Sequence, residues 1–155
     1  FGWGKPVEIN PTNFNRKRSM SAQEAIVAFA GPLMNISIAI VLTIVLYTIG
    51  KFAPGFALTK VGFFVVLTIQ LAIQVNIGLG VFNLVPLPPL DGSKILMHFL
   101  PYNAKTWFKN NENTFYIIFL VLWITNIVSY IIDPVIAVTS NGIYALVSGI
   151  FGLFG

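Results

Sequence analysis

The sequence predicts an all-α protein that crosses a lipid bilayer several times, with one helix broken at residues 83–92. Composition is the first observation: 56% of the 155 residues are hydrophobic and 9% are charged, whereas a soluble domain usually carries about 25% charged residues. The second is a mean hydropathy of +0.83, because a soluble chain of this length could not bury so much apolar surface. The third is a proline-rich stretch between two apolar runs, where no regular helix can form.

The charged residues indicate membrane topology rather than a nucleic-acid surface. They lie in the gaps between apolar runs, as topology determinants do. Counted by side, six basic residues (Arg16, Lys17, Arg18, Lys94, Lys105 and Lys109) face two (Lys51 and Lys60). This asymmetry places the larger group in the cytoplasm. The absence of cysteine excludes disulfides and thiolate metal sites within the chain.

Residues 1–24 are expected to form an interfacial loop and the start of the first helix. Trp3 and the basic residues 16–18 suit the headgroup region of a membrane, although an ordinary juxtamembrane loop would have the same residue types. Ser19 or Ser21 can cap the helix that follows.

Residues 25–49 form the first predicted span, long enough to cross a core of about 30 Å. Within it, Gly31 permits the close approach of another helix, and Pro32 frees a carbonyl in the preceding turn. The amide of Asn35 needs a partner in the membrane. It either holds two helices together or supports a site near residues 83–92, and both interpretations stay open.

Residues 61–82 form the second predicted span, after a turn at 50–60. Gln70 and Gln74 are four residues apart and share a helix face, which we expect to look into protein rather than lipid. A short helix is expected after the break, over residues 92–100.

The C-terminal part is predicted to hold a third span, 115–132, which Asp133 and Pro134 end. Residues 135–154 are apolar and could return across the membrane as a fourth span. Asp133 is interpreted as a helix-junction cap rather than a catalytic residue. The chain thus divides into residues 1–24, the core membrane helices 25–100, a basic interfacial loop 101–113 and the C-terminal membrane helices 114–155.

Asp91 is the strongest candidate for chemistry, because a carboxylate is costly at the depth where it lies. Three roles compete for it. As an N-cap, it would bind the first amides of the next helix, and the residue type by itself favours this role. As an ion or proton relay, it would serve a transporter. As a metal ligand, it would join two imidazoles on zinc and leave one position for water.

The order and spacing of the residues at the break are more specific for a protein family than the residue types alone. The pattern N-x-x-P-x-P-x-L-D-G at residues 83–92 closely resembles the signature of the site-2 proteases, the intramembrane zinc metalloproteases. G-P-x-x-N at residues 31–35 resembles a second feature of that family, at about the expected separation. Residues 2–7 resemble the loop that precedes it in many bacterial members. The three segments stand in the family's order and cover most of residues 1–100.

The resemblance implies roles for the matching residues. Asp91 corresponds to the aspartate that is the third zinc ligand, and Asn83 to the asparagine thought to contact the substrate or the reacting carbonyl. An amide suits that role, because it can donate a hydrogen bond to a developing oxyanion. The prolines would hold the linker extended, so that Asp91 reaches the metal from outside a continuous helix. The residues expected to give structural support are Gly31, Pro32, Asn35, Pro86, Pro88 and Gly92.

One part of the family pattern is missing from the chain. The other zinc ligands in the family are the histidines of a His-Glu-x-x-His helix, whose glutamate is the general base, and these residues contain no such motif. His98 is the single histidine and would lie about 10 Å from Asp91 along a helix, too far to share one zinc ion. We therefore expect His98 to be interfacial or packed. The chain begins at Phe1 where the motif would end, so we expect the motif in sequence outside this chain.

The resemblance implies the C-terminal portion of an intramembrane zinc metalloprotease that cuts transmembrane proteins. Zinc is the expected cofactor, and the expected partners are a transmembrane substrate and a bilayer, with a bacterial inner membrane favoured and no nucleic acid. Without the missing helix, these residues should be inactive and hold zinc weakly. Two alternatives stay open: a non-catalytic scaffold or regulator that binds transmembrane helices, and a transporter fragment. A transporter would need a second, similar broken helix, which the segment around Asp133 does not provide.

Overall fold

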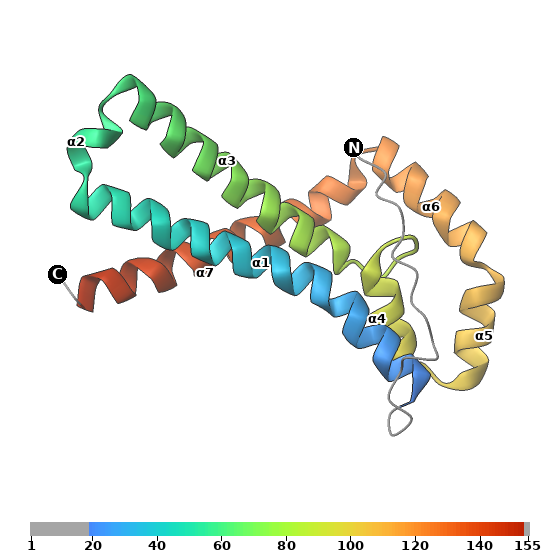
Figure 1. The fold of residues 1–155 in the computed structure, drawn as a ribbon. Helices are drawn as coiled ribbons and strands as arrows, with labels where there is room; N and C mark the ends of the chain where they lie inside the picture. The colour runs from blue at the N-terminus through green and yellow to red at the C-terminus, as the bar shows by residue number, and fades with distance from the viewer. Residues whose placement is uncertain (1–18, 154–155) are drawn as a thin grey trace.

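The computed structural model describes residues 19–153, and all regular structure in that range is helical (Figure 1). The segment at residues 2–7, the aromatic residue Trp3 and the basic cluster 16–18 lie outside the described residues. In chain order the helices are α1 (Met20–Phe52), α2 (Pro54–Ala57), α3 (Lys60–Asn83), α4 (Asp91–Phe99), α5 (Tyr102–Asn110), α6 (Glu112–Ile124) and α7 (Ile127–Leu153).

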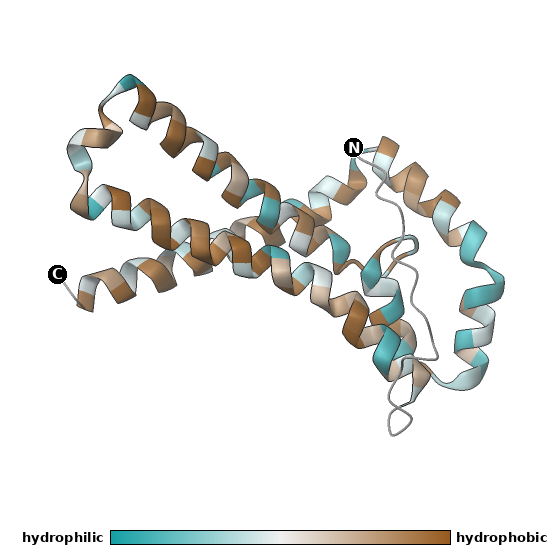
Figure 2. Cartoon of the chain, in the orientation of Figure 1, coloured by the Kyte–Doolittle hydropathy of each residue, from teal (hydrophilic) through white to brown (hydrophobic). Residues whose placement is uncertain are grey.

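Three helices, α1, α3 and α7, are long and apolar enough to cross a membrane. They have 33, 24 and 27 residues, so each exceeds the roughly 20 residues that a bilayer core requires. Apolar residues predominate along them, whereas hydrophilic residues gather on α5 (Figure 2). The prediction of a multi-spanning α-helical membrane protein is therefore confirmed.

Helices α1 and α3 form a close antiparallel pair (Figure 1). Ser19 caps α1 by accepting a hydrogen bond from the amide of Ala22 at 3.2 Å, which selects the first of the two predicted caps. The pair is tightest at Gly80, where an added Cβ would lie 2.9 Å from Ile36 Cδ1 and 3.2 Å from the carbonyl oxygen of Pro32. A small residue at this point lets the two backbones approach, as is usual for helices in membranes.

Helix α7 packs against both members of the pair and runs in the same general direction as α1 (Figure 1). Ile73 and Ile77 of α3 and Val147 of α7 are fully buried where the three helices meet. Tyr47 of α1 lies 5.7 Å from Phe151 near the end of α7, measured between ring centroids. This three-helix core fixes the frame from which α4, α5 and α6 extend.

The prediction that Asp133 and Pro134 end a third span is wrong. Helix α7 continues through both residues, and the chain instead turns at Thr125 and Asn126, where Asn126 has a positive φ of 63°. Asparagine adopts this conformation more readily than most residues. A proline removes one backbone hydrogen bond from a helix and crowds the carbonyl four residues earlier, and membrane helices tolerate both effects when other groups satisfy the freed carbonyl. Helix α6, with 13 residues, is too short for the predicted span over residues 115–132.

Two further expectations need correction. Residues 102–110, within the predicted interfacial loop at 101–113, form helix α5. Its one buried residue, Phe108, stacks on Phe115 of α6 with 4.5 Å between ring centroids, and this contact accounts for local order in a polar sequence. Gln70 and Gln74 are exposed on α3 rather than turned into the described protein.

Candidate active site at the break between α3 and α4

The helical path of α3 ends at Asn83 and resumes in α4 at Asp91, which confirms the predicted break. Short-range hydrogen bonds shape the turn between them, with the amide of Leu87 donating to the carbonyl of Val85 at 2.8 Å and that of Leu90 to Leu87 at 2.9 Å. Pro86 and Pro88 carry no backbone donor, so a helical ladder cannot cross this segment. Pro88 is buried, and Pro86 is exposed.

Gly92 allows the turn to pack closely against the start of α4. An added Cβ there would collide with the carbonyl oxygens of Leu84 and Val85. Because both obstacles are backbone atoms, no side-chain rotation could relieve the collision. The buried Gly92 therefore sets how close the turn lies to Asp91.

Asp91 occupies the first helical position of α4 and does not cap it. Leu90 is the N-cap residue and makes no side-chain capping hydrogen bond, so the N-cap interpretation of Asp91 is wrong. The carboxylate still lies in the first turn, where the helix dipole favours negative charge. Its Oδ1 accepts a hydrogen bond from Lys94 Nζ at 3.3 Å, and the Asp91 side chain is 34% exposed.

The carboxylate of Asp91 lies against Gly31, so the structure unites two motifs that are far apart in sequence. Oδ2 of Asp91 would be 3.6 Å from a Cβ added at Gly31, which is ordinary van der Waals distance. The adjacent Pro32 is fully buried and faces Gly80. Asn35, one turn further along α1, is half-buried, and its amide bonds neither Asn83 nor Asp91 within the described part of the chain.

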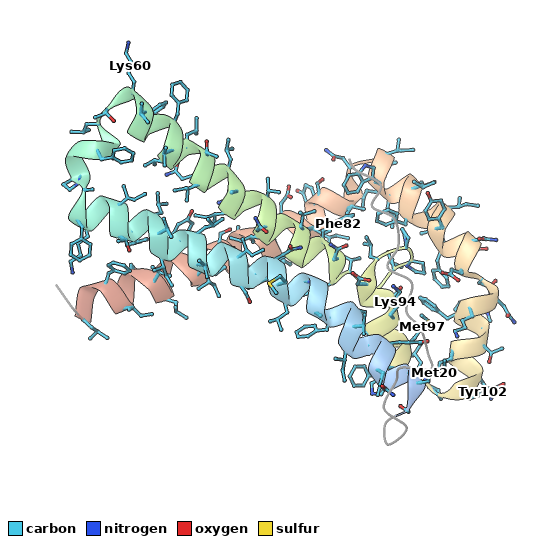
Figure 3. All side chains as sticks on the ribbon, viewed as in Figure 1. Met20, Lys60, Phe82, Lys94, Met97 and Tyr102 are labelled. Carbon is cyan, nitrogen blue, oxygen red and sulfur yellow. The ribbon has the colours of Figure 1, made fainter. Side chains whose placement is uncertain are left out.

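Asn83 ends α3 at the rim of a cavity of about 490 Å³ between α3, α6 and α7. Its half-buried side chain has no hydrogen-bond partner among residues 19–153. The neighbouring Phe82 points toward the same region (Figure 3) and meets the ring of Trp123 at 5.2 Å between centroids. The amide thus remains available to a molecule that enters the cavity.

Lys94 is a site residue that the sequence reasoning used only as a topology charge. It lies three residues after Asp91, and residues at that spacing are neighbours on a helix surface. Ser129 and Asp133 line the same cavity as Asn83, although sequence spacing alone gave no reason to join them. Only the turn at Asn126, which redirects the chain into α7, brings that helix face to the end of α3.

The described residues fit one part of a zinc site. Asp91 offers an oxygen ligand that zinc accepts, and no capping bond holds it. No group of three potential metal ligands occurs among residues 19–153. His98 lies at the other end of α4, where its Nδ1 pairs with Ser21 Oγ at 3.4 Å, so it joins α4 to α1. Among residues 19–153, Asp91 could thus provide one oxygen ligand, and the remaining ligands of a zinc site would have to come from elsewhere.

Comparison with known proteins agrees with the helical break and its sequence pattern. The family model for peptidase family M50 matches residues 56–125, a range that includes both Asn83 and Asp91. The chain is 32% identical to YwhC of Bacillus subtilis, a zinc metalloprotease candidate, over 97% of its own length and 67% of that protein. It is 37% identical to MJ0611 of Methanocaldococcus jannaschii, also a zinc metalloprotease candidate, over 45% of its own length and 31% of that protein.

No solved structure matches the chain significantly. The family assignment therefore rests on the sequence relatives, and the helical break lies where the family-like motif stands in the sequence. The similarity to YwhC extends over 97% of the chain. The chain belongs to peptidase family M50, the site-2 protease family.

Proposed function

We propose that this chain forms part of an intramembrane zinc metalloprotease that cuts transmembrane protein substrates inside a bacterial inner membrane. Family membership supports metalloprotease activity, and three apolar helices make the chain an integral membrane protein. The single observation that carries the proposal is the position of Asp91. A carboxylate that lies at a helix break beside Gly31, and does not cap its own helix, is placed to bind something other than the protein backbone.

In this proposal, Asp91 is one zinc ligand and Asn83 contacts the substrate. When bound, zinc polarises a peptide carbonyl and makes water a nucleophile at neutral pH. The amide of Asn83 would donate a hydrogen bond to the substrate carbonyl, or hold the substrate strand extended beside it. Gly92 and the prolines fix the separation of the two residues, and Gly31 leaves room for the carboxylate.

The imidazole ligands and the general base would come from outside these 155 residues, because the chain holds a single histidine. That histidine contacts Ser21 at the far end of α4. The Asp91–Lys94 pair fits this arrangement, since an ion pair at a partly exposed position is weak. A metal ion could therefore displace Lys94 at little cost.

The test uses the full-length protein, purified and reconstituted in liposomes. Asp91→Asn and Asp91→Ala should lower zinc content and cleavage of a membrane-tethered reporter by about 10- to 100-fold or more. A loss of about 10- to 100-fold is typical even when the mutated group only supports a metal ligand. Asn83→Ala should lower cleavage and leave zinc content unchanged. Glu112→Gln, at the start of α6, is the matched control and should change neither quantity.

Normal zinc content and cleavage in both Asp91 variants would remove this residue from the mechanism. A full-length protein without a His-Glu-x-x-His segment, or one without zinc and activity, would favour the alternative of a scaffold that binds transmembrane helices. The scaffold alternative is compatible with residues 19–153, which contain no group of three potential metal ligands.

A further inference from the structure

Asp133 is an ionisable residue inside a membrane helix to which the proposed chemistry gives no role. It lies within α7, whose apolar composition suits a membrane span. Its side chain is exposed and makes no hydrogen bond or ion pair with the residues that the structure describes. Charged groups in membrane spans are costly and usually serve a partner, a substrate or an ion, so a cation brought to this carboxylate would find it unpaired by residues 19–153.

The cavity that Asp133 lines gives that partner a location. Asp133 and Ser129 are four residues apart and so share one face of α7. That face borders the cavity of about 490 Å³ at whose rim Asn83 lies. Its other walls are largely apolar and include the rings of Phe82 and Trp123. An apolar cleft with a few convergent polar groups is the usual form of a binding site.

We propose that this cavity receives a lysine or arginine side chain of the substrate's transmembrane segment, and that Asp133 pairs with its charge. The proposal rests on the proposed function, because its occupant is the protease substrate. Asp133 is then a specificity-determining residue and not a catalytic one. Asn83, which borders the same cavity, would hold the substrate backbone next to the basic side chain.

Two physical arguments favour a basic occupant over an apolar one. A lysine or arginine combines an apolar stem, which suits the aromatic walls, with a terminal cation, which suits the carboxylate. Transmembrane segments also carry their excess of lysine and arginine at the cytoplasmic end. The end of α3 at Asn83 is predicted to lie toward that side of the membrane, so a basic residue entering there would meet Asp133.

Disulfide crosslinking tests the position of the occupant directly, because the chain has no cysteine of its own. The probe is a synthetic leucine–alanine transmembrane helix with one lysine near one end and a cysteine one turn away. A matched probe carries glutamine in place of the lysine. The target is the full-length protein with Ser129→Cys, with any cysteines outside this chain replaced by serine, in phosphatidylethanolamine–phosphatidylglycerol liposomes.

The lysine probe should crosslink about tenfold more than the glutamine probe, as expected for a charge pair at a desolvated contact. Adding Asp133→Asn should remove this preference, whereas Glu112→Gln should retain it. Asp133→Lys should reverse it and favour a probe with glutamate. The reversal separates a charge contact from a structural role, because a misfolded variant would crosslink to no probe.

Equal crosslinking of the two probes, or a lysine preference that survives Asp133→Asn, would overturn the proposal. So would a failure of every probe to crosslink at position 129. Cleavage is measured in parallel on reporters with the same lysine and glutamine pair. Charge-dependent crosslinking without cleavage would leave the pocket assignment standing and refute the proposed protease function, so the two failures are distinguishable.

Discussion

Oδ2 of Asp91 lies 3.6 Å from the position that a Cβ on Gly31 would occupy. This contact joins the start of α4 to α1 and brings together the two motifs that resemble the site-2 proteases. A methyl group at position 31 would meet the carboxylate at ordinary van der Waals distance, so a longer side chain could bring further atoms against the oxygen. The side chain at position 31 therefore controls the environment of the carboxylate.

Gly31→Ala should be tolerated, whereas Gly31→Leu should impair the site. A methyl group makes an ordinary contact with the carboxylate, so zinc content and reporter cleavage should stay within about threefold of wild type. Leucine places further apolar atoms at the oxygen and should lower both by about tenfold or more, as disturbed ligand support does. The control is Gly142→Leu, because a Cβ at Gly142 meets nothing within 4 Å. Equal effects of the two leucines would contradict the contact.

Gly80→Leu should destabilise the α1–α3 pair. The added atoms would press on Ile36 and on the carbonyl of Pro32, and overpacking of this kind costs about 1–3 kcal/mol. The free energy of unfolding can be measured by titration from mild detergent into dodecyl sulfate. Gly149→Leu is the matched control, since it gains the same helix propensity in open space. A variant at position 80 as stable as this control would show that the helices do not meet there.

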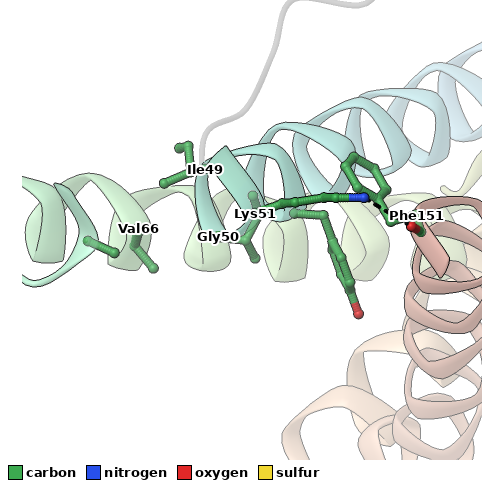
Figure 4. Close-up of a pocket in the computed structure, with 8 residues that line it drawn as sticks. Ile49, Gly50, Lys51, Val66 and Phe151 are labelled. Carbon is green, nitrogen blue, oxygen red and sulfur yellow. Dashed lines mark hydrogen bonds between the residues drawn. The ribbon is translucent and has the colours of Figure 1, made fainter. Parts of the chain in front are cut away.

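Lys51→Met should loosen the end of α7. Lys51 Nζ donates a hydrogen bond to the carbonyl of Phe151 at 3.4 Å, beside a cavity of about 410 Å³ near the α1 C-terminus (Figure 4). A cation at a helix C-terminus contributes about 0.3–1 kcal/mol. Hydrogen exchange of the last turn of α7 should therefore rise by about two- to fivefold. Lys60→Met, on a lysine whose side chain makes no hydrogen bond or ion pair with the described residues, should leave that exchange unchanged.

The helical spans and the broken helix could be predicted from the sequence because each depends on local composition. Twenty or more apolar residues need a membrane, and three prolines within residues 86–89 prevent a continuous helix. The position of Asp91 at the break follows from the same reasoning. Hydrophobic periodicity is a local signal and could not predict the contact between Gly31 and the Asp91 carboxylate, which are far apart in sequence. Only the family resemblance placed the two motifs in one site.

The C-terminal helices were harder to predict, because proline usually ends a helix in a soluble protein but is tolerated inside a membrane helix. Asp133-Pro134 looks like a helix end, yet α7 passes through it, and the real turn is at Asn126 with its positive φ. The sequence gives little sign of that turn among apolar neighbours. The misplaced boundary also hid the relation between Asp133 and Asn83, since both reach one cavity only when α7 begins at Ile127.

Pro134 gives α7 a mechanical weak point. Because proline has no amide hydrogen, the carbonyl of Tyr130 lacks its helical donor, and the backbone there resists bending less than its surroundings. C-terminal to Pro134, Val147 packs in the three-helix core, and the carbonyl of Phe151 accepts a hydrogen bond from Lys51 of α1. N-terminal to Pro134, the first two turns of α7 line the cavity. A swing of the segment before Pro134 would widen or narrow the entrance, and it would also shift Val128 and Ile132, which pack in the three-helix core and line the cavity.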